Sequence, residues 1–183
     1  MILTGGTATR LGGTDKAGLE HAGRTLLDRS IAAVAGAAEV VVVGPSTPTA
    51  SPVRFTLEDP PGGGPLAGVA AGVAALTEGV DRVVVLAVDM PHVTTATVAR
   101  LLAAASEADA SWLVDASGRR QLAGVVRPGL VPPTERAHGA PMRTLMTAGE
   151  ARDVPAQEGE AEDVDTWDDL ARLNDARRPG ERT

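Results

Sequence analysis

The chain has 183 residues, of which 43% are hydrophobic and 22% charged, a balance typical of a folded protein rather than a disordered chain. It contains no cysteine, which excludes disulfides, thiolate nucleophiles and cysteine-ligated metals. A net charge of −7, no tyrosine and one phenylalanine argue against nucleic-acid binding, because phosphates are repelled and bases find few stacking partners.

The apolar runs are short. The longest, at residues 40–43 and 83–88, fall far below the roughly 20 residues that a membrane-spanning helix needs. Residues 1–4 lead straight into glycines without the basic flank of a secretory signal. We therefore expect a cytoplasmic protein that has no membrane partner.

Short β-branched runs alternate with amphipathic stretches along the chain. After an apolar start at 1–3, strands are expected at 39–43, 53–57, 82–88, 111–114, 121–126 and 151–154. Helices are expected at 25–34, 65–76, 95–105, 142–147 and from 166 onward. This alternation predicts an α/β fold with a mainly parallel sheet, formed by a single domain over 1–176 with a frayed tail at 177–183.

Ligands of such sheets bind beyond the carboxyl ends of the strands, which here means after residues 3, 57 and 88. The first of these places is a glycine-rich loop that carries two cations: Leu3, Thr4, Gly5, Gly6, Arg10 and Lys16. Glycines let backbone N–H groups approach an anion closely, and nearby cations strengthen the attraction for phosphate. The loop therefore predicts a phosphate site, with a glycine-rich surface turn as the alternative.

Lys16 is the only lysine among 17 lysine and arginine residues. A chain that uses arginine almost everywhere has kept one compact ammonium, which suggests a place where the broad guanidinium does not fit. The loop lacks the Gly-Lys-Ser/Thr ending of the ATPase phosphate loop, so its chemistry belongs to another class of nucleotide site.

Several segments, in order along nearly the whole chain, resemble the molybdenum cofactor guanylyltransferases. They are Leu-Thr-Gly-Gly at 3–6, Arg-Leu-Gly at 10–12, Asp-Lys at 15–16, Glu-Asp at 58–59, Gly-Pro-Leu-Ala-Gly at 64–68, Asp-Met-Pro at 89–91 and Asp-Val-Asp-Thr at 163–166. The resemblance implies a Rossmann-like three-layer nucleotidyltransferase fold. It also implies transfer of GMP from GTP to the phosphate of molybdopterin, with release of pyrophosphate and delivery to recipient molybdoenzymes.

The same resemblance implies roles for individual residues. The loop residues Leu3, Thr4, Gly5 and Gly6 would bind the nucleotide. Arg10 and Lys16 would act on its phosphates. Asp59 would contact the nucleoside, although Glu-Asp-Pro-Pro at 58–61 also suits an ordinary turn. Asp89 would hold the cofactor Mg²⁺, which suits a carboxylate at the end of a buried strand.

Three other interpretations stay open. Asp165 stands where these guanylyltransferases usually carry asparagine and cytidylyl relatives carry aspartate, so a cytidylyltransferase is one alternative, although Gly5-Gly6 resembles the guanylyl branch. Gly-Gly-Gly-Pro-Leu-Ala at 62–67, followed by Asp89, also fits an NAD(P)-binding fingerprint. The third is a non-catalytic nucleotide-sensing domain. On the acceptor side, the resemblance points to residues 121–124 and Arg143.

Overall fold

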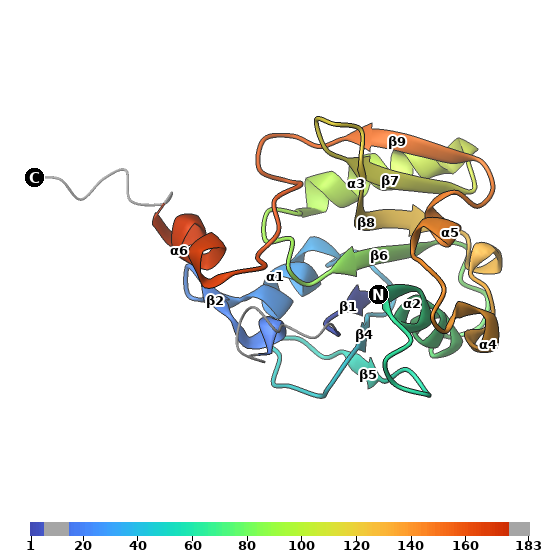
Figure 1. Ribbon diagram of the computed structural model, residues 1–183, viewed down its shortest axis with the longest axis horizontal. Helices are drawn as coiled ribbons and strands as arrows, with labels where there is room; N and C mark the ends of the chain where they lie inside the picture. The colour runs from blue at the N-terminus through green and yellow to red at the C-terminus, as the bar shows by residue number, and fades with distance from the viewer. Residues whose placement is uncertain (6–14, 176–183) are drawn as a thin grey trace, which may run out of the picture.

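The computed structural model describes residues 1–5 and 15–175, and a seven-stranded sheet runs through its centre in the order β5-β4-β1-β6-β8-β7-β9 (Figure 1). The strands are β1 (Ile2–Leu3), β4 (Val41–Val43), β5 (Arg54–Thr56), β6 (Val83–Ala87), β7 (Ala110–Val114), β8 (Arg120–Val126) and β9 (Ala151–Pro155). Strand β8 runs antiparallel to both its neighbours, and the other pairs are parallel. The expected α/β fold with a mainly parallel sheet is confirmed.

Helices cover both faces of the sheet and make three layers. One face packs against α1 (Leu26–Ala33) and α3 (Thr95–Ala104), with α6 (Trp167–Asp175) at the edge of that layer (Figure 1). The other face packs against α2 (Pro65–Ala74), α4 (Thr134–Ala137) and α5 (Arg143–Met146). Three 3₁₀ turns complete the helical segments: η2 (Lys16–Gly18), η3 (Ala105–Glu107) and η4 (Pro128–Leu130).

Strand register explains why the central strands are apolar throughout. Ile2 lies opposite Val42 and Leu86, and all three belong to the core beneath α1 and α3. Leu3 and Val43, one position further along, belong to the core beneath α2. A strand buried on both faces has no solvent side, so it shows no polar alternation.

The helix boundaries follow from capping residues that can be read in the sequence. Thr25 accepts a hydrogen bond from the Asp28 backbone N–H (3.0 Å) and starts α1. Thr166 and Asp169 bond each other's backbone N–H groups (2.8 and 3.1 Å) and so form a capping box before α6. None of the helices in the described residues is long and apolar enough to cross a membrane.

Several short elements were not expected from the sequence, among them α4, the 3₁₀ turns and a hairpin. A small hairpin pairs β2 (Glu20–His21) with β3 (Arg24–Thr25), separate from the main sheet. Each of its strands has only two residues, too few to show a period of two. The hairpin links η2 to α1, and so joins the segment that carries Lys16 to the core.

Candidate active site

The carboxyl ends of β1 and β6 lie side by side and carry two of the expected site segments. The Val88 N–H donates to the Leu3 carbonyl (3.0 Å), and the Thr4 N–H donates to the Val43 carbonyl (3.0 Å). Leu3 is buried in the core, while Thr4 and Gly5 continue beyond the strand toward solvent. Thr4 and Asp89 therefore follow adjacent strands at one edge of the sheet, as the sequence predicts.

Lys16 connects this edge to a distant part of the chain. Its Nζ donates to Oδ2 of Asp89 at 2.9 Å and to Oδ1 of Asp165 at 2.6 Å. The Asp15 side chain fixes the start of η2 by accepting from the Ala17 N–H (3.0 Å). Burial alone would lower the pKa of Lys16, but the hydrogen bonds to the two carboxylates outweigh it and hold the pKa above its usual value.

The second carboxylate arrives on a segment that we call the closing loop, residues 156–166, between β9 and α6. The Val164 N–H donates to the Asp89 carbonyl at 2.9 Å, which seats this loop directly on the end of β6. Asp163, beside it, has a raised pKa because of burial and of the negative charges of Asp165 and Asp89. The site therefore gathers three carboxylates near one ammonium.

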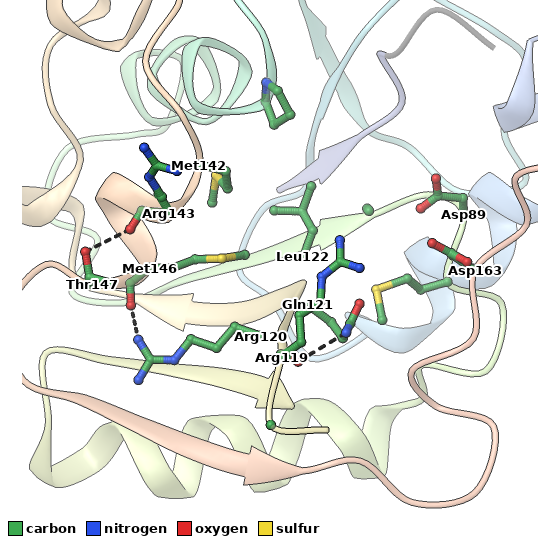
Figure 2. Close-up of a pocket in the computed structure, with 14 residues that line it drawn as sticks. Asp89, Arg119, Arg120, Gln121, Leu122, Met142, Arg143, Met146, Thr147 and Asp163 are labelled. Carbon is green, nitrogen blue, oxygen red and sulfur yellow. Dashed lines mark hydrogen bonds between the residues drawn. The ribbon is translucent and has the colours of Figure 1, made fainter. Parts of the chain in front are cut away.

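A cavity of about 690 Å³ opens from this cluster toward α5 (Figure 2). Asp89 and Asp163 lie at one end, and Arg143 lies at the other, with Gln121 and Leu122 of β8 between them (Figure 2). Figure 2 shows the Arg119 side chain directed into the cavity from the turn before β8. The cavity thus has an acidic end, an apolar middle and cationic groups along its remaining length.

The cationic groups of the cavity differ in their partners. Arg120 is held by Asp153, with Nε 2.6 Å from Oδ1, and by the Met146 carbonyl. Arg119 and Arg143 make no ion pair of this kind with any residue in the described parts of the chain. Their charge remains available to an anion that enters the cavity.

The structure places the remaining expected residues apart from this cluster. Asp59 is exposed beyond β5, does not line the cavity and lies two strands away from β1. Its neighbour Glu58 accepts from the Gly62 N–H (2.8 Å), so the segment forms a turn. Arg10 and Gly6 lie outside the described residues. Gln121, Leu122 and Arg143, which the resemblance puts on the acceptor side, line the cavity.

The same expectation is wrong for the other two residues of 121–124, because they belong to the sheet interior. Ala123 is fully buried, and Gly124 packs under the Trp112 ring. A Cβ on Gly124 would collide with Cε3 of Trp112 and with the Ser111 backbone carbonyl, so a larger residue requires both the ring and the neighbouring strand to move. Ala123 pairs with Leu86 and Gly124 pairs with Val85 and Trp112, so this half of the run lies where β8 is enclosed by its neighbouring strands, beyond the part that reaches the cavity.

The glycines of the dinucleotide-binding alternative also have a packing role. A Cβ on Gly63 would collide with Nδ1 of His138, and the Gly63 carbonyl accepts from the Gly139 N–H (2.9 Å). The close approach of the α4 segment therefore explains why Gly63 has no side chain. Packing therefore explains the glycine at position 63 without a bound dinucleotide.

Sequence reasoning assigned no role to Asp163 or Arg119. Asp163 stands two residues before Asp165, a spacing that puts both side chains on one side of an extended segment, and this signal was present in the sequence. Arg119 had no such signal, because only the β7–β8 turn directs it into the cavity.

The carboxylates near Lys16 have the chemistry of metal ligands. The described residues contain no group of three or more histidine, aspartate or glutamate side chains that could hold a metal ion alone. Asp89 and Asp165 nevertheless contact the same ammonium, so their oxygens converge on one small volume. Two hard oxygen donors beside a phosphate site fit Mg²⁺, which is usually held by one or two carboxylates plus substrate phosphates.

Comparison with known families is decisive for the class of protein. Residues 1–154 match the family described as "MobA-like NTP transferase domain". The chain belongs to this family. The family membership confirms the resemblance drawn from the motifs, and it places this MobA-like NTP transferase among nucleotidyltransferases rather than among dinucleotide-binding modules.

The curated relatives with moderate sequence identity to this chain are named as molybdenum cofactor guanylyltransferases. The molybdenum cofactor guanylyltransferase of Acidiphilium cryptum (strain JF-5) is 44% identical over 110 residues, 57% of this chain and 56% of the relative. The probable molybdenum cofactor guanylyltransferase of Mycobacterium tuberculosis (strain ATCC 25618 / H37Rv) is 32% identical over 161 residues, 84% and 80% of the two chains. The match thus spans little more than half of the first of these relatives.

Solved structures show the same fold. Molybdopterin-guanine dinucleotide biosynthesis protein A from Archaeoglobus fulgidus has a TM-score of 0.72 at 19% identity, covering 96% of each chain. The 2-C-methyl-D-erythritol 4-phosphate cytidylyltransferase from Thermus thermophilus also has a TM-score of 0.72, at 23% identity and covering 97% of each chain. The three-layer nucleotidyltransferase fold of this MobA-like NTP transferase is confirmed, and the fold by itself serves more than one nucleotide.

Proposed function

We propose that this protein transfers GMP from GTP to the phosphate of molybdopterin and releases pyrophosphate. The observation that carries the proposal is the contact of Lys16 with Asp89 and Asp165, beside a cavity lined by two guanidinium groups, Arg119 and Arg143, that form no ion pair within the described residues. The curated relatives, which are named molybdenum cofactor guanylyltransferases, support the choice of nucleotide and acceptor.

The nucleotide binds on the β1–β4–β5 side of the site. Leu3, Thr4, Gly5 and Gly6 form the segment that contacts it, and Lys16 and Arg10 neutralise its phosphates. Asp59, exposed beyond β5, lies on the side of the sheet away from the cavity. A nucleoside whose phosphates reach Lys16 can extend in that direction.

Asp89 and Asp165 are the residues that would hold Mg²⁺. When bound there, the ion neutralises negative charge on the phosphate oxygens and acts as a Lewis acid. Lys16, which lies between the two carboxylates, is placed to stabilise the negative charge that develops on the transferred phosphoryl group.

The acceptor occupies the cavity on the β6–β8 side. Its phosphate lies at the acidic end near Lys16, with Arg119 offsetting the repulsion from Asp89 and Asp163. Its ring system lies over Leu122, and Arg143 is close to the far part of the acceptor rather than to the reacting phosphate. The acceptor oxygen attacks the α-phosphorus in line, and catalysis comes from positioning and electrostatics without a covalent enzyme intermediate.

The test compares the binding of GTP, CTP, ATP, UTP and NAD by calorimetry, each with and without Mg²⁺, followed by turnover with molybdopterin. We expect magnesium-dependent preference for GTP and formation of pyrophosphate. Asp89→Ala should abolish turnover while the protein stays folded. Metal-independent NAD binding, or GTP binding that EDTA leaves unchanged, would contradict the proposal, and GTP binding without turnover would favour the nucleotide-sensing alternative.

A second candidate, transfer of CMP to molybdopterin or another phosphorylated acceptor, is favoured by one observation. Asp165 places a carboxylate, rather than the amide expected of the guanylyl branch, against Lys16. Preference for CTP over GTP in the same calorimetric series would select this candidate. Replacing Asp165 by Asn should then shift the preference away from CTP.

We further propose that residues 1–176 act as one catalytic domain, because the strands of the sheet and the closing loop all contribute to the same site. The protein would work in the cytoplasm, where GTP is available, and deliver its product to recipient molybdoenzymes.

A further inference from the structure

The closing loop has no regular secondary structure, yet it carries Asp163 to the cavity and Asp165 to Lys16. A loop of this kind loses much conformational freedom when it takes one position, so something must hold it. Its two ends are fixed: the Ala156 N–H donates to the Val114 carbonyl (2.8 Å), and the capping box of Thr166 begins α6. Besides these ends and the contact of Val164 with the end of β6, the structure contains a further attachment in the middle of the loop.

That attachment is Glu160, whose exposed fraction is only 6%. Its carboxylate accepts from Thr97 Oγ1 at 2.6 Å, from Arg100 Nη1 and Nη2 at 3.0 and 2.5 Å, and from the Gln157 N–H at 2.7 Å. We call this set of contacts the Glu160 anchor. It joins the closing loop to α3, an element of the core layer that does not itself line the cavity.

Glu160 is the one acidic residue in the buried group of the described chain. A buried ion pair seldom stabilises a protein more than well-packed apolar residues would, because both charges must be removed from water. Burial by itself would raise the pKa of Glu160, but the hydrogen bonds from Arg100, Thr97 and the Gln157 N–H hold it below its usual value. The carboxylate is therefore ionised at neutral pH and fixed in direction by four donors.

The anchor is close to the site along the chain. Asp163 follows Glu160 by three residues, a stretch that spans at most about 11 Å when extended. Val164, next in line, is 2% exposed and donates its N–H to the Asp89 carbonyl at 2.9 Å. The path from Glu160 to the cavity is thus short and fixed at both ends.

We infer that Glu160 is a positioning residue of the proposed transferase: by anchoring the closing loop to α3, it holds Asp163 at the acidic end of the cavity and Asp165 against Lys16. The inference rests on the proposed function only where it gives Asp163 and Asp165 a role in catalysis. The attachment itself can be tested without turnover.

The first test measures amide hydrogen exchange in Glu160→Ala and Glu160→Gln. In Glu160→Ala we expect the Val164 amide to exchange about tenfold faster or more, while amides of β6 keep their protection, because only the loop loses its attachment. Glu160→Gln should show a smaller effect, since the amide oxygen can still accept from Thr97. Unchanged protection of Val164 in Glu160→Ala would overturn the inference.

Glu150→Gln is the matched control. Glu150 also pairs with an arginine, Arg152 at 2.9 Å, but its side chain is 62% exposed and does not contact the closing loop. The control removes the same charge from the protein and should leave the exchange of Val164 unchanged.

The second test uses turnover. Loss of a group that orients a metal ligand typically costs about 10–100-fold in metal affinity or activity, so the Mg²⁺ concentration for half-maximal rate should rise about tenfold in Glu160→Ala. A purely structural role would lower kcat in proportion to the folded fraction and leave the Mg²⁺ dependence and the acceptor KM unchanged. If the wild-type protein shows no transfer while the exchange result holds, the proposed function fails and the anchor stands.

Discussion

At the scale of single residues, the site depends on one ammonium between two carboxylates. Lys16 lies 2.9 Å from Asp89 and 2.6 Å from Asp165, and its side chain is only 15% exposed. A guanidinium carries the same charge but spreads it over a plane and needs more room. The retention of a single lysine in an arginine-rich chain is therefore explained by the shape of this contact.

We predict that Lys16→Arg lowers kcat for nucleotide transfer about tenfold or more although the charge is kept, because the broad fork cannot fit both carboxylates and the phosphates. Steady-state transfer rates measure the effect. The reverse exchange at an exposed position, Arg136→Lys, should leave the rate unchanged. Wild-type kcat in Lys16→Arg would show that only the charge matters.

At the scale of elements, the sheet positions the site through close contacts between strands. Gly124 of β8 lies under Trp112 of β7, which is completely buried, and this contact sets the approach of the two strands. Strand β8 also carries Gln121 and Leu122 to the cavity. A change in the packing of β8 is therefore expected to move side chains that line the cavity.

Gly124→Ala should lower the free energy of unfolding by about 1–3 kcal/mol, the usual cost of forcing an extra methyl group into a packed interior. Urea denaturation followed by circular dichroism gives the value. Gly129→Ala serves as the control, because no atom lies within 4 Å of the added Cβ. Equal stability of the two variants would mean that the Trp112 ring moves aside at little cost.

Much of this architecture could be predicted from the sequence, and the limits have physical reasons. Buried apolar strands such as β6 and caps such as Thr25 are local signals, so element order and boundaries followed from short windows. The contact of Lys16 with Asp165 joins positions 149 residues apart, and no local pattern encodes it. The assignment of 121–124 as one ligand-facing run failed because residues 123 and 124 lie where β8 is enclosed by β6 and β7, a pairing that no local pattern encodes.

At the scale of the whole molecule, the Glu160 anchor makes the free energy of unfolding depend on pH. The folded-state pKa of Glu160 is depressed, so its contribution to stability is present above the unfolded-state pKa. That contribution is lost as the pH falls from the unfolded value through the folded one. At neutral pH the contribution is complete.

We predict that the loss of stability on going from pH 7 to pH 4 is smaller in Glu160→Gln than in the wild-type protein, because glutamine cannot be protonated in this range. Urea midpoints at several pH values measure both curves. Glu150→Gln should follow the wild-type curve, since its ion pair is exposed to solvent. Parallel curves for Glu160→Gln and the wild type would show that Glu160 does not contribute to acid sensitivity.

The long separation between Lys16 and Asp165 also orders events during protein synthesis. The strands β1, β4 and β6 can leave the ribosome and begin to pair while the closing loop has not yet been made. The residues proposed to bind phosphate thus emerge on a nascent chain before Asp163 and Asp165 exist to meet them. The chain gains its complete acidic cluster only after β9, the last strand of the described sheet, has been made.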